Sequence, residues 1–198
     1  MTNRAGARAP ASRSWCRRCP AGSPPTVRTA AARSALASAP PEYFVTEHRR
    51  RQLDEVLANR ATASRSGTVG AVAVDADGHV ACATSTGGMV GQSVGRIGDT
   101  PLIGAGSYAA DDAVAVSCTG EGEADIRGVV AHDITARLRY GHVGLEEAVR
   151  ASYRTQLEPY GATGGTIAVT PAGEALIACN SNAMFAGCWT PTAQQTFV

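Results

Sequence analysis

The sequence predicts a mixed α/β fold, because segments typical of strands and of helices follow one another along the chain. Short runs of small or β-branched residues, bounded by turn residues, predict strands at 68–74, 79–86, 101–109, 113–118, 165–170 and 174–180. Hydrophobic residues at helical spacing predict helices at 124–140 and 145–157. Since 44% of the 198 residues are hydrophobic, the chain can bury one good core, and we expect one folded domain.

The stretch 67–88, GTVGAVAVDADGHVACATSTGG, predicts a β-hairpin whose first strand begins with a threonine. That strand has the composition of one buried on both faces. The turn at 75–78 would place opposite each other residues whose numbers add up to about 153–154. Thr68 would then face Ser85 or Thr86. Threonine is common in strands for its shape alone, but paired hydroxyls at a strand end make Thr68 a candidate nucleophile.

The N-terminal region differs in composition from the rest of the chain. Residues 1–40 contain seven of the eighteen Arg, no acidic residue and half of the ten Pro, while residues 41–198 contain all seventeen acidic residues. We expect 1–40 to be a disordered basic tail. A transit peptide, a nucleic-acid contact and a start site that is not the natural one are the alternative interpretations.

Two further observations concern compartment and metal. Cys16 and Cys19 form a lone C-x-x-C, whereas a structural zinc site needs four ligands. The other cysteines lie mainly in apolar runs, and the four histidines lack ligand spacing. We therefore expect a cytoplasmic protein without a metal or cofactor. No run of eighteen apolar residues occurs, so no membrane-spanning segment is expected.

The segment 41–67 predicts a helix followed by a linker. Thr46 is a candidate N-cap, and Leu53, Val56 and Leu57 follow at helical spacing. The three arginines at 49–51 are expected on a solvated face.

A glycine-rich loop at 89–99 contains Arg96 and Asp99. The glycines argue against a helix, so the pair would lie in a loop. There it is either a surface ion pair or a clamp for a zwitterion, in which Arg96 binds a carboxylate and Asp99 an ammonium group.

The sequence Thr119-Gly120-Glu121-Gly122-Glu123 predicts a turn before a helix. Such a turn can present backbone N–H groups to a ligand. It is too short for a phosphate-binding loop and lacks the lysine of one, which argues against nucleotide binding.

The motifs GTVGAVAVD, TSTGGM, GRIGDTPLIGAG and SCTGEGE closely resemble the N-terminal-nucleophile threonine hydrolases of the isoaspartyl peptidase and plant-type L-asparaginase group. The resemblance extends from about Pro41 to the C-terminus and is most specific from Gly67 to Glu123. It implies an αββα sandwich, with 41–67 as a remnant of the α-subunit end and 68–198 as the β-subunit.

The resemblance also implies how the reaction begins. The bond between Gly67 and Thr68 would be cleaved autocatalytically, so that Thr68 becomes a chain terminus. Its hydroxyl would be the nucleophile and its own α-amine the base, with an unperturbed pKa of about 7.7–8.0. Thr86 would hydrogen-bond near the nucleophile. The substrates would be β-aspartyl (isoaspartyl) dipeptides, L-asparagine or both, and the product L-aspartate.

Five residues would hold the substrate in this scheme. Thr119 and Gly120 would stabilise the oxyanion and, together with Gly122, hold the substrate. By the same resemblance, Arg96 would bind the α-carboxylate and Asp99 the α-amine.

The resemblance does not extend over residues 1–40. Family members have a longer α-subunit that opens with a His-Gly-Gly-Ala-Gly-type motif, which is absent before Thr68. We therefore expect a sandwich that is incomplete on its N-terminal side, with an unpaired sheet edge and an uncovered apolar face. A homodimer or an assembly of α and β chains would complement it, without nucleic acid or membrane. The alternatives are a catalytically inactive remnant, or an inert domain with a nucleic-acid-binding tail.

Overall fold

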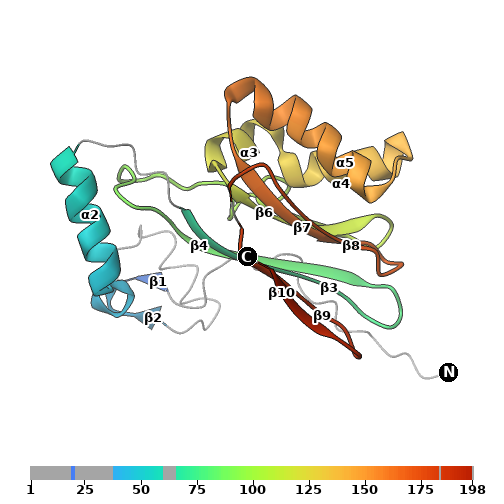
Figure 1. Cartoon of the computed structure of the whole chain (residues 1–198), viewed down its shortest axis with the longest axis horizontal. Coiled ribbons are helices and arrows are strands. Elements are labelled where there is room, and N and C mark those ends of the chain that lie inside the picture. Colours follow the sequence, from blue (N-terminus) through green and yellow to red (C-terminus); the bar gives the residue numbers. More distant parts are fainter. Residues whose placement is uncertain (1–18, 21–37, 60–65, 183, 198) are drawn as a thin grey trace.

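The computed structural model describes residues 19–20, 38–59, 66–182 and 184–197, and in these ranges helices and antiparallel sheets form layers (Figure 1). The central layer is a four-stranded sheet in the order β5-β6-β7-β8. Its strands are β5 (Ser107–Ala110), β6 (Val114–Gly120), β7 (Gly164–Val169) and β8 (Ala175–Cys179). This confirms the predicted mixed α/β fold class.

The second layer is the predicted hairpin, formed by β3 (Ser66–Val74) and β4 (Val80–Met89), which packs against β5, β6 and β7. Thr68 pairs with Thr86 and Val74 with Val80. The residue numbers therefore add up to 154, the upper of the two expected values. The turn supplies the register as expected, with the Asp75 carboxylate accepting hydrogen bonds from the backbone N–H groups of Asp77 and His79 at 2.9 Å.

The two faces of this hairpin have different surroundings. Even-numbered residues in 68–74 and 80–86 face the four-stranded sheet and are buried or half-buried. Odd-numbered residues face outward and are exposed, and Val69 retains 73% of its accessible surface. The prediction that 68–74 is buried on both faces was therefore wrong, because the residues of the outer face are exposed.

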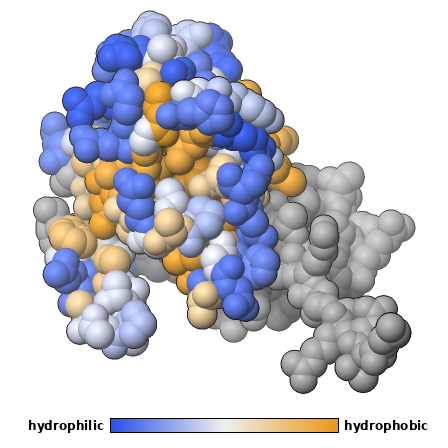
Figure 2. All heavy atoms as spheres, turned by 90° about the vertical axis from the view of Figure 1, so that its right-hand side faces the viewer, coloured by the Kyte–Doolittle hydropathy of each residue, from blue (hydrophilic) through white to orange (hydrophobic). Residues whose placement is uncertain are grey.

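Three helices form the third layer on the opposite face of the central sheet (Figure 1). They are α3 (Gly122–Gly128), α4 (Val130–Gly141) and α5 (Leu145–Ser152), which continues through a π-helical turn, Tyr153–Leu157, and a 3-10 turn, Glu158–Tyr160. Ile134, Leu145 and Leu157 are almost fully buried in the core between these helices and the sheet. Seen from the right-hand end of Figure 1, the helix layer is largely hydrophilic and hydrophobic residues lie below it (Figure 2).

Two predicted elements were wrong in extent. The helix expected at 124–140 is broken at Val129, whose φ of +47° is left-handed. The backbone N–H groups that begin α4 then donate to a neighbouring loop, Ala131 to Ala105 and His132 to Gly104. The strand expected at 101–109 is reduced to β5, because 101–106 folds into turns in which Gly106 N–H donates to the Asp99 carbonyl at 3.2 Å.

The remaining elements lie outside these layers. A 3-10 turn (Pro41–Phe44) precedes α2 (Glu47–Asn59), and β9 (Ala186–Trp189) pairs with β10 (Gln194–Phe197). Two short strands, β1 (Cys19–Pro20) and β2 (Ser38–Ala39), pair in parallel. Residues 1–18 and 21–37 of the predicted tail lie outside the described residues, as does most of the linker. No helix in the described ranges is long and apolar enough to span a membrane.

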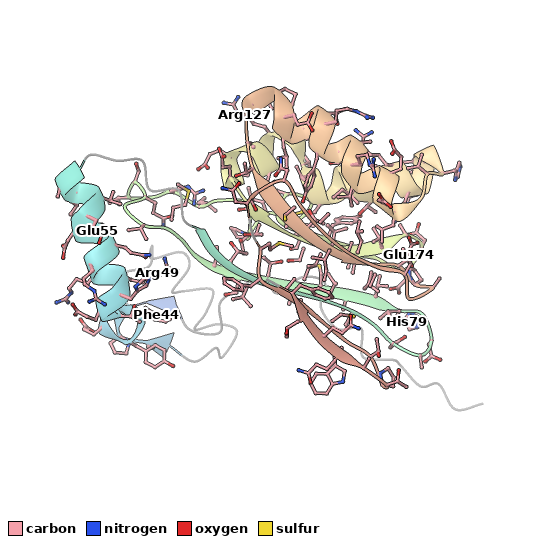
Figure 3. All side chains as sticks on the ribbon, viewed as in Figure 1. Phe44, Arg49, Glu55, His79, Arg127 and Glu174 are labelled. Carbon is pink, nitrogen blue, oxygen red and sulfur yellow. The ribbon has the colours of Figure 1, made fainter. Side chains whose placement is uncertain are left out.

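The α2 segment lies at the opposite end of the molecule from the hairpin tip. Phe44, Arg49 and Glu55 are at one end and His79 at the other (Figure 3). Thr46 caps α2 as predicted, its hydroxyl accepting a hydrogen bond from the Arg49 backbone N–H at 3.2 Å. The expected apolar stripe of α2 is only partly buried. Leu57 is 68% exposed, while Val56 is half-buried beside Gly91.

Candidate active site

A cluster of hydroxyl groups lies where β3 begins and β4 ends. The Thr68 hydroxyl donates to the Thr86 hydroxyl oxygen at 3.4 Å, and the Thr86 hydroxyl donates to the Gly67 carbonyl at 3.3 Å. Thr86 also accepts a hydrogen bond from the Gly88 N–H at 3.0 Å. This arrangement joins the Thr68 hydroxyl, through one side chain, to the carbonyl group of the preceding residue.

The hairpin positions these groups because β4 pairs directly opposite β3. Opposed residues of an antiparallel pair share one face of the sheet, so both threonine side chains face the central sheet. Ser85, the other expected neighbour, faces outward and is exposed, so the hydroxyl beside Thr68 belongs to Thr86.

A cavity of about 120 Å³ lies beside Thr68, between the hairpin and the central sheet. Thr119 lines the same cavity. It is the register partner of Gly165 where β6 pairs with β7. The other lining residues of the cavity are Gly70, Ser117, Cys118, Gly165, Ile167, Met184, Phe185, Ala186 and Gly187. The structure therefore brings together two predicted site residues that are 51 positions apart, Thr68 and Thr119.

Gly120 is the next residue of β6 and requires glycine. Its φ is +144°, and a Cβ there would lie 2.4 Å from the Thr163 carbonyl oxygen. Its conformation and its tight contact with Thr163 and Gly164 both exclude a side chain.

Arg96 and Asp99 meet at Gly122, the first residue of α3. A Cβ on Gly122 would lie 2.7 Å from Asp99 Oδ1 and 3.1 Å from Arg96 Nη2. The two predicted clamp residues therefore flank one position, and they lie in a loop as expected.

Arg96 has a partner that sequence reasoning missed, Glu123. Nε donates to Oε1 at 2.6 Å and Nη2 to Oε2 at 3.0 Å, while Nη1 donates to Gln92 at 3.2 Å. The hydrogen bond from Arg96 lowers the pKa of Glu123. Glu123 stands within the SCTGEGE motif, but its distance of 27 residues from Arg96 gave no sign of the pairing.

Asp99 is a buried carboxyl group, 7% exposed. Burial raises its pKa, and the nearby Arg96 charge opposes that rise. Among the described residues its Oδ2 has no hydrogen-bond partner. A buried acceptor without a donor carries a desolvation cost, and an ammonium group of a ligand would remove it.

Asp125 is a second buried carboxyl group near the site, and the sequence gave no reason to single it out. It is 1% exposed in the first turn of α3. Burial, followed by the charges of Asp99 and Glu121, raises its pKa to about 8. Asp125 is therefore largely neutral at pH 7.

Arg49 reaches the other side of the candidate cleavage site. A Cβ on Gly67 would lie 2.6 Å from its Nη2, so the guanidinium group of α2 lies against Gly67. The three arginines at 49–51 are exposed, as expected for a solvated face, and Arg49 contacts Gly67 as well. No group of three or more His, Cys, Asp or Glu side chains in the described ranges is arranged to hold a metal ion.

Comparison with known proteins decides the family. The asparaginase family matches residues 17–198. The chain belongs to this family. It is 43% identical over 156 residues to the isoaspartyl peptidase of Escherichia coli K12, covering 73% of this chain and 49% of that protein.

Plant and animal members are similar to the chain as well. A probable isoaspartyl peptidase/L-asparaginase 2 of Arabidopsis thaliana is 50% identical over 123 residues, which cover 62% of this chain and 37% of that protein. The human isoaspartyl peptidase/L-asparaginase is 38% identical over 159 residues, 78% of this chain and 51% of that protein. The chain thus spans about half the length, or less, of these asparaginase-family relatives.

Proposed function

We propose that this chain hydrolyses β-aspartyl dipeptides, L-asparagine or both to L-aspartate, with Thr68 as an N-terminal nucleophile released by cleavage after Gly67. The observation that carries the proposal is the hydrogen-bonded path from the Thr68 hydroxyl through Thr86 to the Gly67 carbonyl. The names of the relatives support the choice of substrates.

Maturation would begin with attack of the Thr68 oxygen on the Gly67 carbonyl carbon. The new C–O bond forms, the C–N bond breaks as the amide nitrogen takes up a proton, and water then cleaves the resulting ester. The products are a carboxylate at Gly67 and a free amine and hydroxyl at Thr68. The Thr86 hydroxyl at the Gly67 oxygen and the Arg49 guanidinium group beside Gly67 would both favour the oxyanion.

In the reaction itself, the free α-amine of Thr68 would take the proton from its hydroxyl. The oxygen attacks the side-chain carbonyl of the β-aspartyl group, and ammonia or an amino acid leaves with a proton. Water then releases L-aspartate and restores Thr68. Donors at Thr119 and Gly120 would stabilise the oxyanion, an effect commonly worth ~2.7–4 kcal/mol per donor.

The headgroup of the substrate would lie at Gly122. Asp99, whose Oδ1 lies at Gly122, would accept its ammonium group, and Arg96 would bind its carboxylate. Glu123 already occupies two donors of Arg96, so the substrate would use the remaining edge of the guanidinium group.

The exposed outer face of the hairpin favours an assembly. Residues 68–198 would act as the β-subunit part and 41–67 as the end of the α-subunit part, complemented by a second copy or another chain. The alternative is an inactive family member that retains these motifs but does not mature.

The test is release of L-aspartate from L-asparagine and from a β-aspartyl dipeptide. We expect release by the wild-type chain and none by Thr68→Ala. Ser85→Ala is the matched control, because it removes a hydroxyl from the same hairpin but from the outer face. Loss of activity in both variants, or no release by the wild type, would count against the proposal.

A further inference from the structure

The C-terminal part of the chain contributes a wall to the cavity beside Thr68. Four consecutive residues, Met184–Gly187, line it, although they follow Thr68 by more than a hundred positions. The clamp residues Arg96 and Asp99 do not line this cavity. The cavity therefore extends from the candidate nucleophile to a region that the clamp does not reach.

Met184 is fixed in this wall by contact with β7. A Cβ on Gly165 would lie 2.3 Å from the Met184 sulfur, so the thioether occupies the space above that glycine. Gly165 is the register partner of Thr119, and a Cβ on it would also lie 3.2 Å from the Thr119 methyl group. Met184 thus lies directly beside the residue proposed to stabilise the oxyanion.

The chemistry of the cavity is apolar with a few hydroxyl groups. Met184, Phe185 and Ile167 supply hydrocarbon and sulfur surface, and within the described ranges no charged residue lines the cavity. The Ser117 hydroxyl is already hydrogen-bonded to the Thr84 hydroxyl at 2.7 Å. Such a lining favours an aliphatic group over a charged one.

The size of the cavity sets a limit on its ligand. A volume of about 120 Å³ has room for several water molecules. A branched aliphatic side chain can replace such water. Phe185, which is 84% exposed, lies at the rim and not at the base.

We infer that this cavity is the subsite for the side chain of the amino acid that leaves, with Met184 as its specificity-determining wall. The inference rests on the proposed function. With the aspartyl headgroup at Gly122 and the scissile carbonyl at Thr68, the leaving residue extends beyond Thr68, away from the clamp. The class of ligand is a β-aspartyl dipeptide whose second residue is small or branched and aliphatic.

The first test compares aspartate release from β-aspartyl-leucine, β-aspartyl-glycine and L-asparagine. In the wild type we expect a higher kcat/KM for the leucine than for the glycine dipeptide. Met184→Ala should lower that preference about tenfold, the scale of a lost hydrophobic contact. Met184→Leu, which restores the bulk, should retain it within about threefold.

The outcomes separate the two proposals. An unchanged leucine-to-glycine preference in Met184→Ala, with hydrolysis intact, would overturn the subsite and leave the proposed function standing. A fall in kcat/KM by the same factor for all three substrates would also overturn it, because L-asparagine releases only ammonia. Absence of hydrolysis with every substrate would count against the proposed function.

A binding measurement decides the subsite without turnover. The chain has three methionines, so labelling with [methyl-¹³C]methionine gives three methyl signals, and Met184→Leu identifies that of Met184. In the full-length Thr68→Ala chain, which lacks the proposed nucleophile and leaves the dipeptide intact, we expect millimolar β-aspartyl-leucine to shift this signal and β-aspartyl-glycine to shift it less. Equal shifts, or no shift with the leucine dipeptide, would overturn the inference.

Discussion

The hairpin β3–β4 and the central sheet β5–β8 have similar compositions but different surroundings. Both consist mainly of small and β-branched residues. Val114, Ala115 and Val116 in β6 have no exposed surface, since helices cover one face and the hairpin the other. In β3, by contrast, Val69 is 73% exposed.

This difference shows that the composition of a strand indicates which of its faces can be buried. The elements that pack against the strand determine which of these faces are buried. The inner face of the hairpin holds the hydroxyl cluster and packs on the central sheet. Its outer face has the same apolar character without cover in the described ranges. The assembly proposed above would cover this face.

The largest expected contrast between the two regions comes from truncating one side chain in each. Ile134 in α4 is fully buried, and Ile134→Ala should lower the free energy of unfolding by about 2–5 kcal/mol, from lost burial and a cavity. Val69→Ala, on the exposed face, should change it by less than about 0.5 kcal/mol. Urea denaturation of the isolated chain measures both. A cost above about 1 kcal/mol for Val69→Ala would mean that the outer face is covered in solution.

The second prediction concerns Asp125, the buried carboxyl group on the side of the central sheet that the helices cover. Because the folded pKa of Asp125 is raised to about 8, its contribution to stability is present below its unfolded pKa near 4 and is lost as pH rises towards 8. Asp125→Asn should remove this dependence and stabilise the chain at pH 8, with little gain at pH 4. Glu146→Gln, at an exposed carboxylate of α5, is the control. Parallel stability–pH curves for wild type and Asp125→Asn would contradict a dry interior.

The third prediction concerns the bond that joins the two layers. The hydroxyls of Thr84 and Ser117 are buried and 2.7 Å apart, one from each layer. Thr84→Val should cost about 1–3 kcal/mol, because Ser117 loses its partner. The double variant with Ser117→Ala should cost less than the sum of the two single changes. Simple additivity in urea unfolding would show that the pair does not couple the layers.

The sequence was informative wherever local chemistry determines geometry. The turn at 75–78 predicted that Thr68 faces Ser85 or Thr86, and Thr86 is the partner. The helix break at Val129 could not be predicted, because loop carbonyls of Gly104 and Ala105 satisfy the first N–H groups of α4. A left-handed valine is a consequence of that tertiary contact.

In the candidate site, too, the sequence indicated the residues that are close together in the chain and missed those that are distant. Arg96 and Asp99 were identified because they lie three residues apart in one glycine-rich loop. Glu123 and Met184 were missed because they reach the site from α3 and from the segment before β9. Only the pairing of strands and the packing of layers bring such distant residues together.

The central claim is that Thr68 is placed to act on the Gly67 carbonyl, and the intact mass of the purified chain tests it most directly. The wild-type chain, followed over days beside Thr68→Ala, should separate into residues 1–67 and 68–198, while the variant remains whole. Wild-type and variant chains that both remain whole would contradict the account, because the α-amine of Thr68 would never be released.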